Sequence, residues 1–188
     1  AILTASLVLA GCTAGSGASA PPQSTTSSSV TEDFNSADVM FAQMMVPHHV
    51  QAVEMSDVIL AKEGIAPRVV TLAEEIKAAQ QPEIGALNGM IEAWGMPPAA
   101  TDGMDMGHGG HMDGMMTEED MQALEAATGP DASRLFLEQM IVHHEGAVEM
   151  AQAQVDSGVN PDAVSMAQSI IDTQNGEIET MRDILLSL

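Results

Sequence analysis

The chain has 188 residues, enough for one domain with a real core, and carries 27 Asp and Glu against 5 Lys and Arg, a formal net charge of −22. This charge argues against nucleic acid and anionic membrane surfaces as partners and favours cations. Aromatic residues make up only 2% of the chain while 16 residues are Met, so base-stacking surfaces and large β-sandwiches are not expected, and the excess of thioether needs an explanation.

The first two segments, residues 1–11 and 12–35, are predicted to lie outside the fold. Residues 1–11 (AILTASLVLAG) are apolar but shorter than the roughly 20 residues of a membrane span, so they indicate the remnant of a secretory signal peptide. The run ending in Gly11-Cys12 resembles a bacterial lipobox, which predicts an exported protein anchored by a lipid on Cys12. The alternative is an ordinary cleavage site followed by an incidental thiol. Residues 12–35 are small, polar and proline-bearing, and predict a flexible tether.

From residue 36 onward the apolar residues recur with the helical period, which predicts one helical domain over residues 36–188. We expect long helices at about 36–63, 67–94, 131–157 and 161–187. Short turns join them in pairs, at Gly64 with Pro67 and at Gly158 with Pro161, where glycine would take the left-handed conformation that ends a helix. A kink is predicted near Pro82, and a short helix is predicted to begin at Thr117 and to be closed by Gly129-Pro130.

The helical region contains an internal repeat, and the two copies of a helical hairpin predict an all-α four-helix bundle. In the first helix of each copy the offset is 95 residues and relates Phe41, Met45, His48, His49, Val53, Glu54 and Met55 to Phe136, Met140, His143, His144, Val148, Glu149 and Met150. In the second helix the offset is 94 and relates Ala73, Ile76, Gln80, Glu83 and Ile84 to Ala167, Ile170, Gln174, Glu177 and Ile178.

One face of each first helix combines thioether and imidazole. Helical spacing places Met45, His48, Ala52 and Met55 on a single face, and the second copy repeats it with Met140, His143, Ala147 and Met150. His49 and His144 lie beside this face. Thioether with imidazole favours Cu(I), so these helices are predicted to bind copper. The alternative is that the methionines fill the core and the histidines are hydrogen-bonded core residues.

A di-iron bundle is the main competing interpretation of paired histidines on helices. It requires Glu three residues before each His, where this chain has Met45 and Met140. Glu54 and Glu149 fall on the opposite side and are expected to be solvated. Glu145 is a further acidic candidate, but the matching position in the first copy is Val50.

Residues 101–116 form a segment rich in Met and His, interspersed with Gly and Asp and without an amphipathic period. Because such residues have no core to fill, we interpret them as ligands for soft metal ions, and thioethers keep this capacity in mild acid. The alternative is a loop that docks on apolar surfaces. The candidate ligands are Met104, Met106, His108, His111, Met112, Met115 and Met116.

The motifs Met45-Val-Pro-His-His49 and Met140-Ile-Val-His-His144, each followed by Glu-Met, resemble the family known as domain of unknown function 305 (DUF305). The resemblance covers residues 36–188 and implies an exported, ferritin-like four-helix bundle, several members being associated with copper binding and tolerance. It implies copper ligands at Met45, His48, Met55, Met140, His143 and Met150, with His49 and His144 as further candidates.

The sequence therefore predicts an extracytoplasmic copper-binding protein that is not an enzyme and that buffers, tolerates or delivers the metal. Cu(I) is the preferred ion, and Cu(II) is a second candidate that the histidines would bind. Two alternatives remain: a bundle metalloenzyme of di-iron or copper oxidase type, and a structural or partner-binding surface protein whose methionines form an adaptable contact patch.

Overall fold

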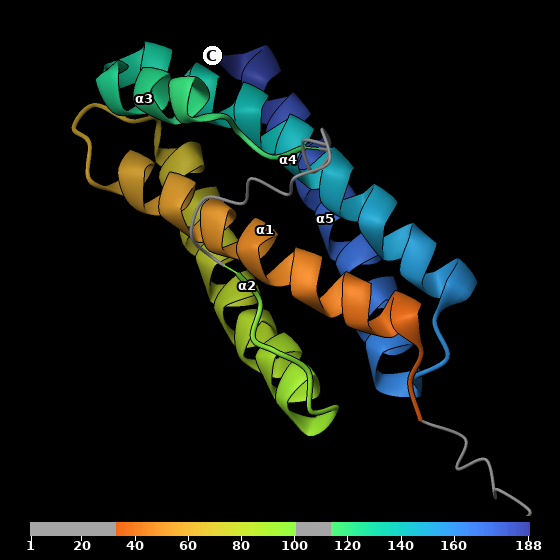
Figure 1. Cartoon of the computed structure of the whole chain (residues 1–188). Helices are drawn as coiled ribbons and strands as arrows, with labels where there is room; N and C mark the ends of the chain where they lie inside the picture. The colour runs from red at the N-terminus through yellow and green to blue at the C-terminus, as the bar shows by residue number, and fades with distance from the viewer. Residues whose placement is uncertain (1–32, 101–113) are drawn as a thin grey trace, which may run out of the picture. The chain divides into compact units, whose positions relative to one another are not determined.

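A computed structural model describes residues 33–100 and 114–188, and all regular secondary structure within these ranges is helical. The prediction of an all-α fold is therefore confirmed. The helices are α1 (Ser36–Leu60), α2 (Pro67–Ala93), α3 (Glu118–Ala126), α4 (Gly129–Ser157) and α5 (Pro161–Ser187) (Figure 1). Among the described residues, no helix is both long enough and apolar enough to cross a membrane.

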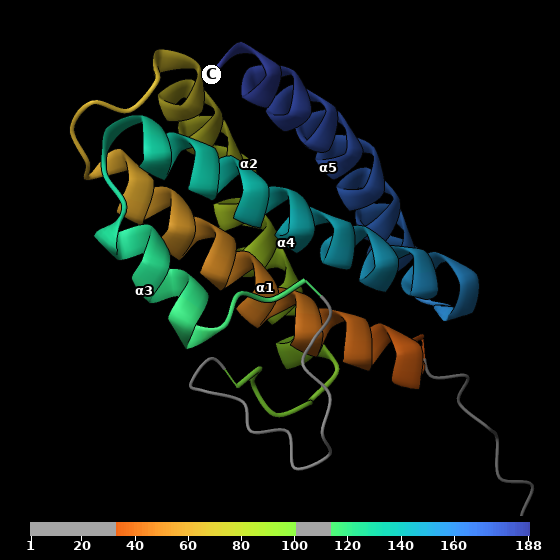
Figure 2. The same cartoon turned by 90° about the horizontal axis from the view of Figure 1, so that it is seen from above.

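The helices form two antiparallel hairpins, α1 with α2 and α4 with α5, which meet through α1 and α4 (Figures 1 and 2). The short helix α3 packs against both α1 and α4. The outer helices α2 and α5 contact each other far less than either contacts its hairpin partner. The two predicted hairpins are thus present, while their packing as a ferritin-like four-helix bundle stays a prediction.

Helix starts follow the signals in the sequence. Asn35 caps α1 in a reciprocal capping box with Asp38, and Thr117 caps α3 in the same way with Asp120. Pro67 and Pro161 begin α2 and α5, where their missing N–H would have had no intrahelical partner. The predicted starts of these helices are therefore confirmed.

Three details of the helix ends differ from the prediction. The first helix ends at Leu60 rather than at residue 63, and α3 ends at Ala126, so Gly129-Pro130 does not close the short helix but begins α4. Gly64 has the expected left-handed φ of 73°, whereas Gly158 is extended with φ of −71° and ψ of 156°. Glycine is needed at position 158 for space, because a Cβ there would collide with the Gln154 side chain. Helix α2 continues through Pro82.

The buried carboxylate of Asp38 ties the start of α1 to the end of the second hairpin. It accepts hydrogen bonds from Gln154 Nε2 at 2.5 Å and from the backbone N–H groups of Val159 and Asn160 at 3.2 and 3.1 Å. Burial raises the pKa of Asp38, but these bonds and one from the Asn35 backbone outweigh it and lower the pKa below the ordinary 3.8. This ionised contact fixes α1 against the turn between α4 and α5.

Candidate metal centre

Two histidines meet where α1 crosses α4. His48 and His143 are fully buried, and their ring centroids lie 3.8 Å apart with an angle of 39° between the ring planes. The two residues are equivalent in the internal repeat, so the two copies meet through the same side chain. The sequence prediction that this helix face points inward is correct.

The neighbouring histidines are each held by a carboxylate from the partner helix of their own hairpin. His49 Nε2 lies 2.7 Å from Glu83 Oε2, and His144 Nε2 lies 2.7 Å from Glu177 Oε2. Both imidazoles are fully buried, whereas the carboxylates reach the surface, with side-chain exposures of 24% and 14%. The repeat therefore produces two matching histidine–carboxylate pairs.

These pairs determine which ring nitrogen is available for a metal ion. An ionised carboxylate can only accept a hydrogen bond, so Nε2 of His49 and of His144 is the donor. In the neutral ring Nδ1 then carries the free lone pair, and in both residues Nδ1 is buried and finds no hydrogen-bond partner among the described residues. A carboxylate that orients a histidine through its other nitrogen is a common support for a metal ligand.

Four methionines lie along the same faces. Met45, Met55 and Met140 are fully buried, and Met150 is half-buried. Met55 and Met140 belong to one hydrophobic cluster, while Met45 belongs to a second cluster against which Met150 packs. Since Met45 precedes and Met55 follows His48 along α1, the clusters lie on either side of the histidines, and each combines thioethers from both copies of the repeat.

Buried amides add to the polar interior on the outer helices. Gln80 and Gln174 are each 2% exposed and lie one helical turn before Glu83 and Glu177. Both polar atoms of the Gln80 amide and Oε1 of Gln174 lack a hydrogen-bond partner among the described residues. The sequence analysis assigned no role to these four side chains, although their recurrence at an offset of 94 residues singled out their positions.

The interior holds His143 in its neutral form. Burial lowers its pKa well below 6.5, and the nearby charges that His48, His144 and His49 would carry lower it further, while a backbone hydrogen bond with His48 acts in the opposite direction. A neutral imidazole is the form that binds metal.

The ligand types available favour a soft ion over a hard one. In the described part of the chain, no group of three or more His, Cys, Asp or Glu side chains is arranged to hold a metal ion. Glu54 and Glu149 are exposed, as predicted, and Glu145 is an exposed partner of Arg182 at 2.7 Å. Where α1 and α4 cross, the candidate ligands are therefore imidazole and thioether, a combination that suits Cu(I).

The Met-rich segment is described only at its end. Met104, Met106, His108, His111 and Met112 lie outside the described residues. Met115 and Met116 are half-buried, and the Met116 side chain packs against the core, contrary to the expectation that this segment fills no core. The Met116 backbone is fixed to α1 because it both accepts from Gln51 Nε2 at 2.9 Å and donates to Gln51 Oε1 at 2.8 Å.

Comparison with known families gives a match over most of the chain. The model of the family described as domain of unknown function (DUF305) matches residues 38–185. Comparison with functionally curated proteins found no significant match.

Several solved structures are similar to this chain. A DUF305 fragment from Deinococcus radiodurans is 32% identical with a TM-score of 0.72, covering 82% of this chain and 98% of that one. A DUF305 protein from Streptomyces coelicolor, described as secreted, is 32% identical with a TM-score of 0.71, covering 80% and 91%. CopM in its Cu(I)-bound form is 29% identical with a TM-score of 0.65, covering 80% and 96%. Cu(II)-bound and silver-bound forms of CopM are also similar to it.

Proposed function

The chain belongs to the DUF305 family, and we propose that it is an exported protein that binds copper, chiefly as Cu(I), in order to buffer it or pass it on. The ion is the protein's cargo and undergoes no catalysed reaction. The buried side chains of α1 and α4 provide the binding site, in the core of a ferritin-like pair of hairpins.

One observation carries this proposal: the duplicated interior places imidazole and thioether side chains from both hairpins around one crossing point. His48 and His143 meet at 3.8 Å, and His49 and His144 each present a buried Nδ1 lone pair with no hydrogen-bond partner among the described residues. Leaving buried polar atoms unpaired costs about 1–3 kcal/mol each, so a ligand that engages them is the expected compensation. Neutral imidazole and thioether engage soft ions best.

CopM supplies independent support. Its Cu(I)-bound and Cu(II)-bound forms are 29% and 30% identical to this chain, with TM-scores of 0.65 and 0.67. Both oxidation states agree with a site that offers imidazole for Cu(II) and thioether for Cu(I). We propose that the chain prefers Cu(I) because its available ligands are thioethers rather than carboxylates. The carboxylates of Glu83 and Glu177 are engaged with His49 and His144. The available thioethers are those of Met45, Met55, Met140 and Met150.

The Met-rich segment has a complementary proposed role. Residues 101–116 would capture ions and transfer them to the buried site by ligand exchange, and their thioethers have no proton to lose in mild acid. The backbone of Met116 is fixed to Gln51 on α1, so this end of the segment is held beside the helix that carries His48 and His49.

Export is supported by the similarity to the Streptomyces coelicolor protein that is described as secreted. We propose further that Cys12 carries a lipid that anchors the protein outside the cytoplasm. Metal capture in this location serves tolerance or delivery, and a delivery partner would exchange ligands with the protein.

The two alternative functions have weaker support. A di-iron oxidase needs a cluster of carboxylates and histidines, and the described residues contain no such group. A partner-binding surface protein would use exposed methionines, but three of the four methionines on the histidine faces, Met45, Met55 and Met140, are fully buried, which suits ligation better than docking.

The proposal is tested by anaerobic titration of the full chain with Cu(I) in competition with a chromophoric chelator. We expect Glu83→Gln/Glu177→Gln to weaken the tightest site by about 10- to 100-fold, because the amides support the histidines less well than the carboxylates do. The matched control is Glu74→Gln/Glu179→Gln, which removes the same two charges from exposed positions on the same helices.

A second variant, His49→Gln/His144→Gln, removes the proposed ligands themselves. It should lower the number of tightly held Cu(I) ions while the helical circular dichroism of the apo protein is unchanged. If both variants hold as much Cu(I) as the wild type with the same affinity, the buried side chains are core residues and the proposed site is refuted.

A further inference from the structure

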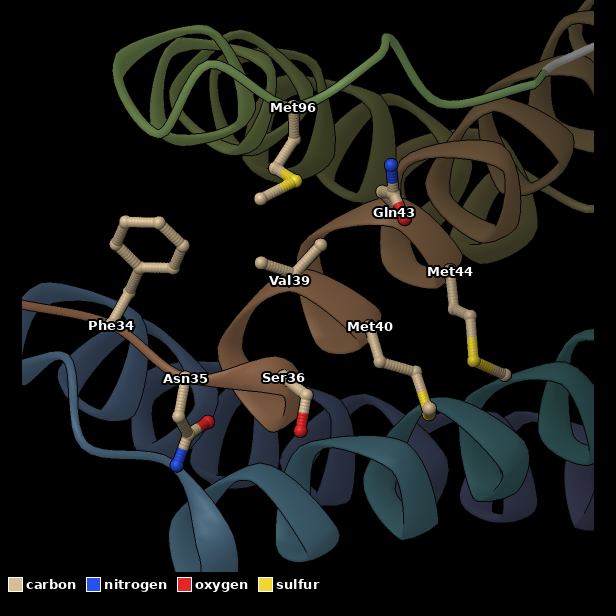
Figure 3. A pocket seen from close by; sticks show the side chains of 8 residues that line it. All are labelled: Phe34, Asn35, Ser36, Val39, Met40, Gln43, Met44 and Met96. Atoms are coloured by element: carbon tan, nitrogen blue, oxygen red, sulfur yellow. The ribbon is translucent and has the colours of Figure 1, made fainter. Parts of the chain in front are cut away.

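A second group of methionines lies nearer the start of α1 than the buried histidines, where solvent reaches the helix. Met40 and Met44 are one helical turn apart, and Met40 is 60% exposed, although it is a large apolar side chain. Both also line a hollow at the start of α1 together with Val39 and Met96, and Figure 3 shows the side chains of Met40 and Met44 extending toward α4 while that of Met96 extends toward Val39. Met40 and Met44 therefore form a ridge of thioethers that the solvent can reach.

The ridge borders a hollow between α1 and α4 that also contains Met150. This hollow has a volume of about 340 Å³, and Met40, Met44 and Met150 all line it. Three thioethers from two helices thus face one small, largely apolar space. Phe41 forms part of its wall and belongs to the buried cluster that contains Met45.

The internal repeat shows that these methionines are not required by the packing of the hairpins. The residues equivalent to Met40 and Met44 in the second copy are Leu135 and Gln139. Gln139 is 8% exposed and donates a hydrogen bond to the backbone carbonyl of Asp120 in α3 at 2.9 Å. The second copy therefore uses this face to bind α3, whereas the first copy leaves it to solvent and places thioethers there.

We propose that Met40, Met44 and Met150 form a surface site for a soft monovalent metal ion. A leucine at these positions would fill the same space, but only the thioether sulfur adds a soft ligand that stays unprotonated in acid. The formal net charge of −22 raises the concentration of cations at the surface. Met44 lies one helical turn before His48 and Met40 two turns before it, so the two extend the line of His48 toward the start of α1, and neither is among the methionines assigned to the buried site.

The place of Met150 connects this surface site with the interior. Met150 lines the hollow and also packs against the cluster that contains Met45, which is one turn before His48. An ion held at the surface is therefore one ligand exchange away from the buried thioethers. This transfer rests on the proposed function, in which Met150 is also a candidate ligand of the buried site, whereas Met40 and Met44 have no part in that function.

The experiment uses the full chain labelled with ¹³C at the methionine methyl groups and titrated with silver nitrate in chloride-free buffer. Each methyl resonance is assigned by a single Met→Leu substitution, which keeps the volume of the side chain. We expect the resonances of Met40, Met44 and Met150 to shift together with the same dependence on silver. In Met40→Leu/Met44→Leu the Met150 resonance should no longer shift over the silver concentrations at which the three resonances shift together in the wild type. The number of silver ions bound should fall by one.

The matched control is Met166→Leu, a half-buried methionine of α5 that packs against the same cluster but lies outside the hollow. It should leave the stoichiometry unchanged. The inference is overturned if the Met40 and Met44 resonances stay in place while the other methionines saturate, since the ridge is then only an apolar surface. If they shift while Met45 and Met140 do not, the surface site stands and the proposed buried copper site fails.

Discussion

The protonation state of His143 is determined by its buried surroundings. Its ring lies 3.8 Å from that of His48, with His49 and His144 near enough that any charge on these neighbours would oppose a proton on His143. Burial and these neighbours lower its pKa well below 6.5. The folded chain therefore excludes a proton that the unfolded chain accepts.

This difference predicts that acid destabilises the apo protein. Above pH 6.5 His143 is neutral in both states, and the free energy of unfolding owes nothing to its protonation. Below pH 6.5 the unfolded chain binds a proton that the folded chain does not, so the free energy of unfolding falls by up to about 1.4 kcal/mol per pH unit for this group. Urea unfolding of the metal-free protein between pH 8 and pH 5 measures the slope.

His143→Gln provides the comparison, since it removes the titrating group while keeping a polar side chain. Its unfolding free energy should vary less steeply over the same pH range than that of the wild type. Equal slopes for the two proteins would show that His143 does not control the acid sensitivity of the fold.

At this scale the sequence predicted the inward histidines but not their partners. Helical spacing alone places His48 on the face of Met45, because both positions belong to one helix. Glu83 and Glu177 lie on other helices, so their contacts with His49 and His144 depend on how α2 and α5 are rotated within the hairpins. Only their recurrence in both copies marked them, and recurrence does not distinguish a core position from a ligand support.

At the scale of the elements, the two copies of the repeat differ where residues 114–116 pack against them. Gly114 packs against the backbone of α4, and an added Cβ would lie 2.8 Å from Gly146 Cα and 2.9 Å from the Val142 carbonyl oxygen. Gln51 holds Met116 from the side of α1. Gly146 and Gln51 occupy equivalent positions of the repeat. Glycine in one copy leaves space for the backbone of Gly114, and glutamine in the other binds the backbone of Met116, so the difference between the copies fixes residues 114–116 in place.

Gly114→Ala is expected to displace this seat. Gly114 has a φ of 86°, which alanine adopts only with strain, and the added Cβ meets rigid backbone. Gly95→Ala is the matched control, because Gly95 has a φ of 67° but open space around it. We expect Gly95→Ala to cost about 1 kcal/mol of unfolding free energy and Gly114→Ala about 1–3 kcal/mol more, measured by urea unfolding.

The two variants distinguish backbone strain from steric collision, because the added methyl group causes strain at both Gly95 and Gly114 but collides with other atoms only at Gly114. Equal losses in the two variants would mean that residues 114–116 adapt freely and are not fixed on α4. The sequence could not reveal this seat, since a glycine among the many glycines of residues 101–116 carries no mark of close approach to a distant helix. The helix starts were predictable because capping boxes and prolines act within a few residues.

At the scale of the whole molecule, the repeat predicted two hairpins, and the structure shows that they join mainly through α1 and α4. An ion held by side chains of both helices would link the hairpins, and only binding that distinguishes the folded from the unfolded chain adds stability. Ions bound equally well by both states leave the free energy of unfolding unchanged, so capture by a segment that binds in either state does not contribute.

Thermal unfolding with increasing silver or Cu(I) therefore reports on the linkage between the hairpins. For the wild type we expect a gain of about 2.7 kcal/mol when the free ion is at 100 times its dissociation constant, a rise of roughly 5–10 °C in the unfolding temperature. In His143→Gln/His144→Gln the ligands of α1 remain, while α4 loses its imidazoles and keeps only the thioethers of Met140 and Met150, so the ion links the two hairpins less strongly. Most of the gain should disappear in this variant, although its apo form still folds. A full gain would show that the imidazoles of α4 do not hold the ion, in which case the contact between His48 and His143 serves packing and not metal binding.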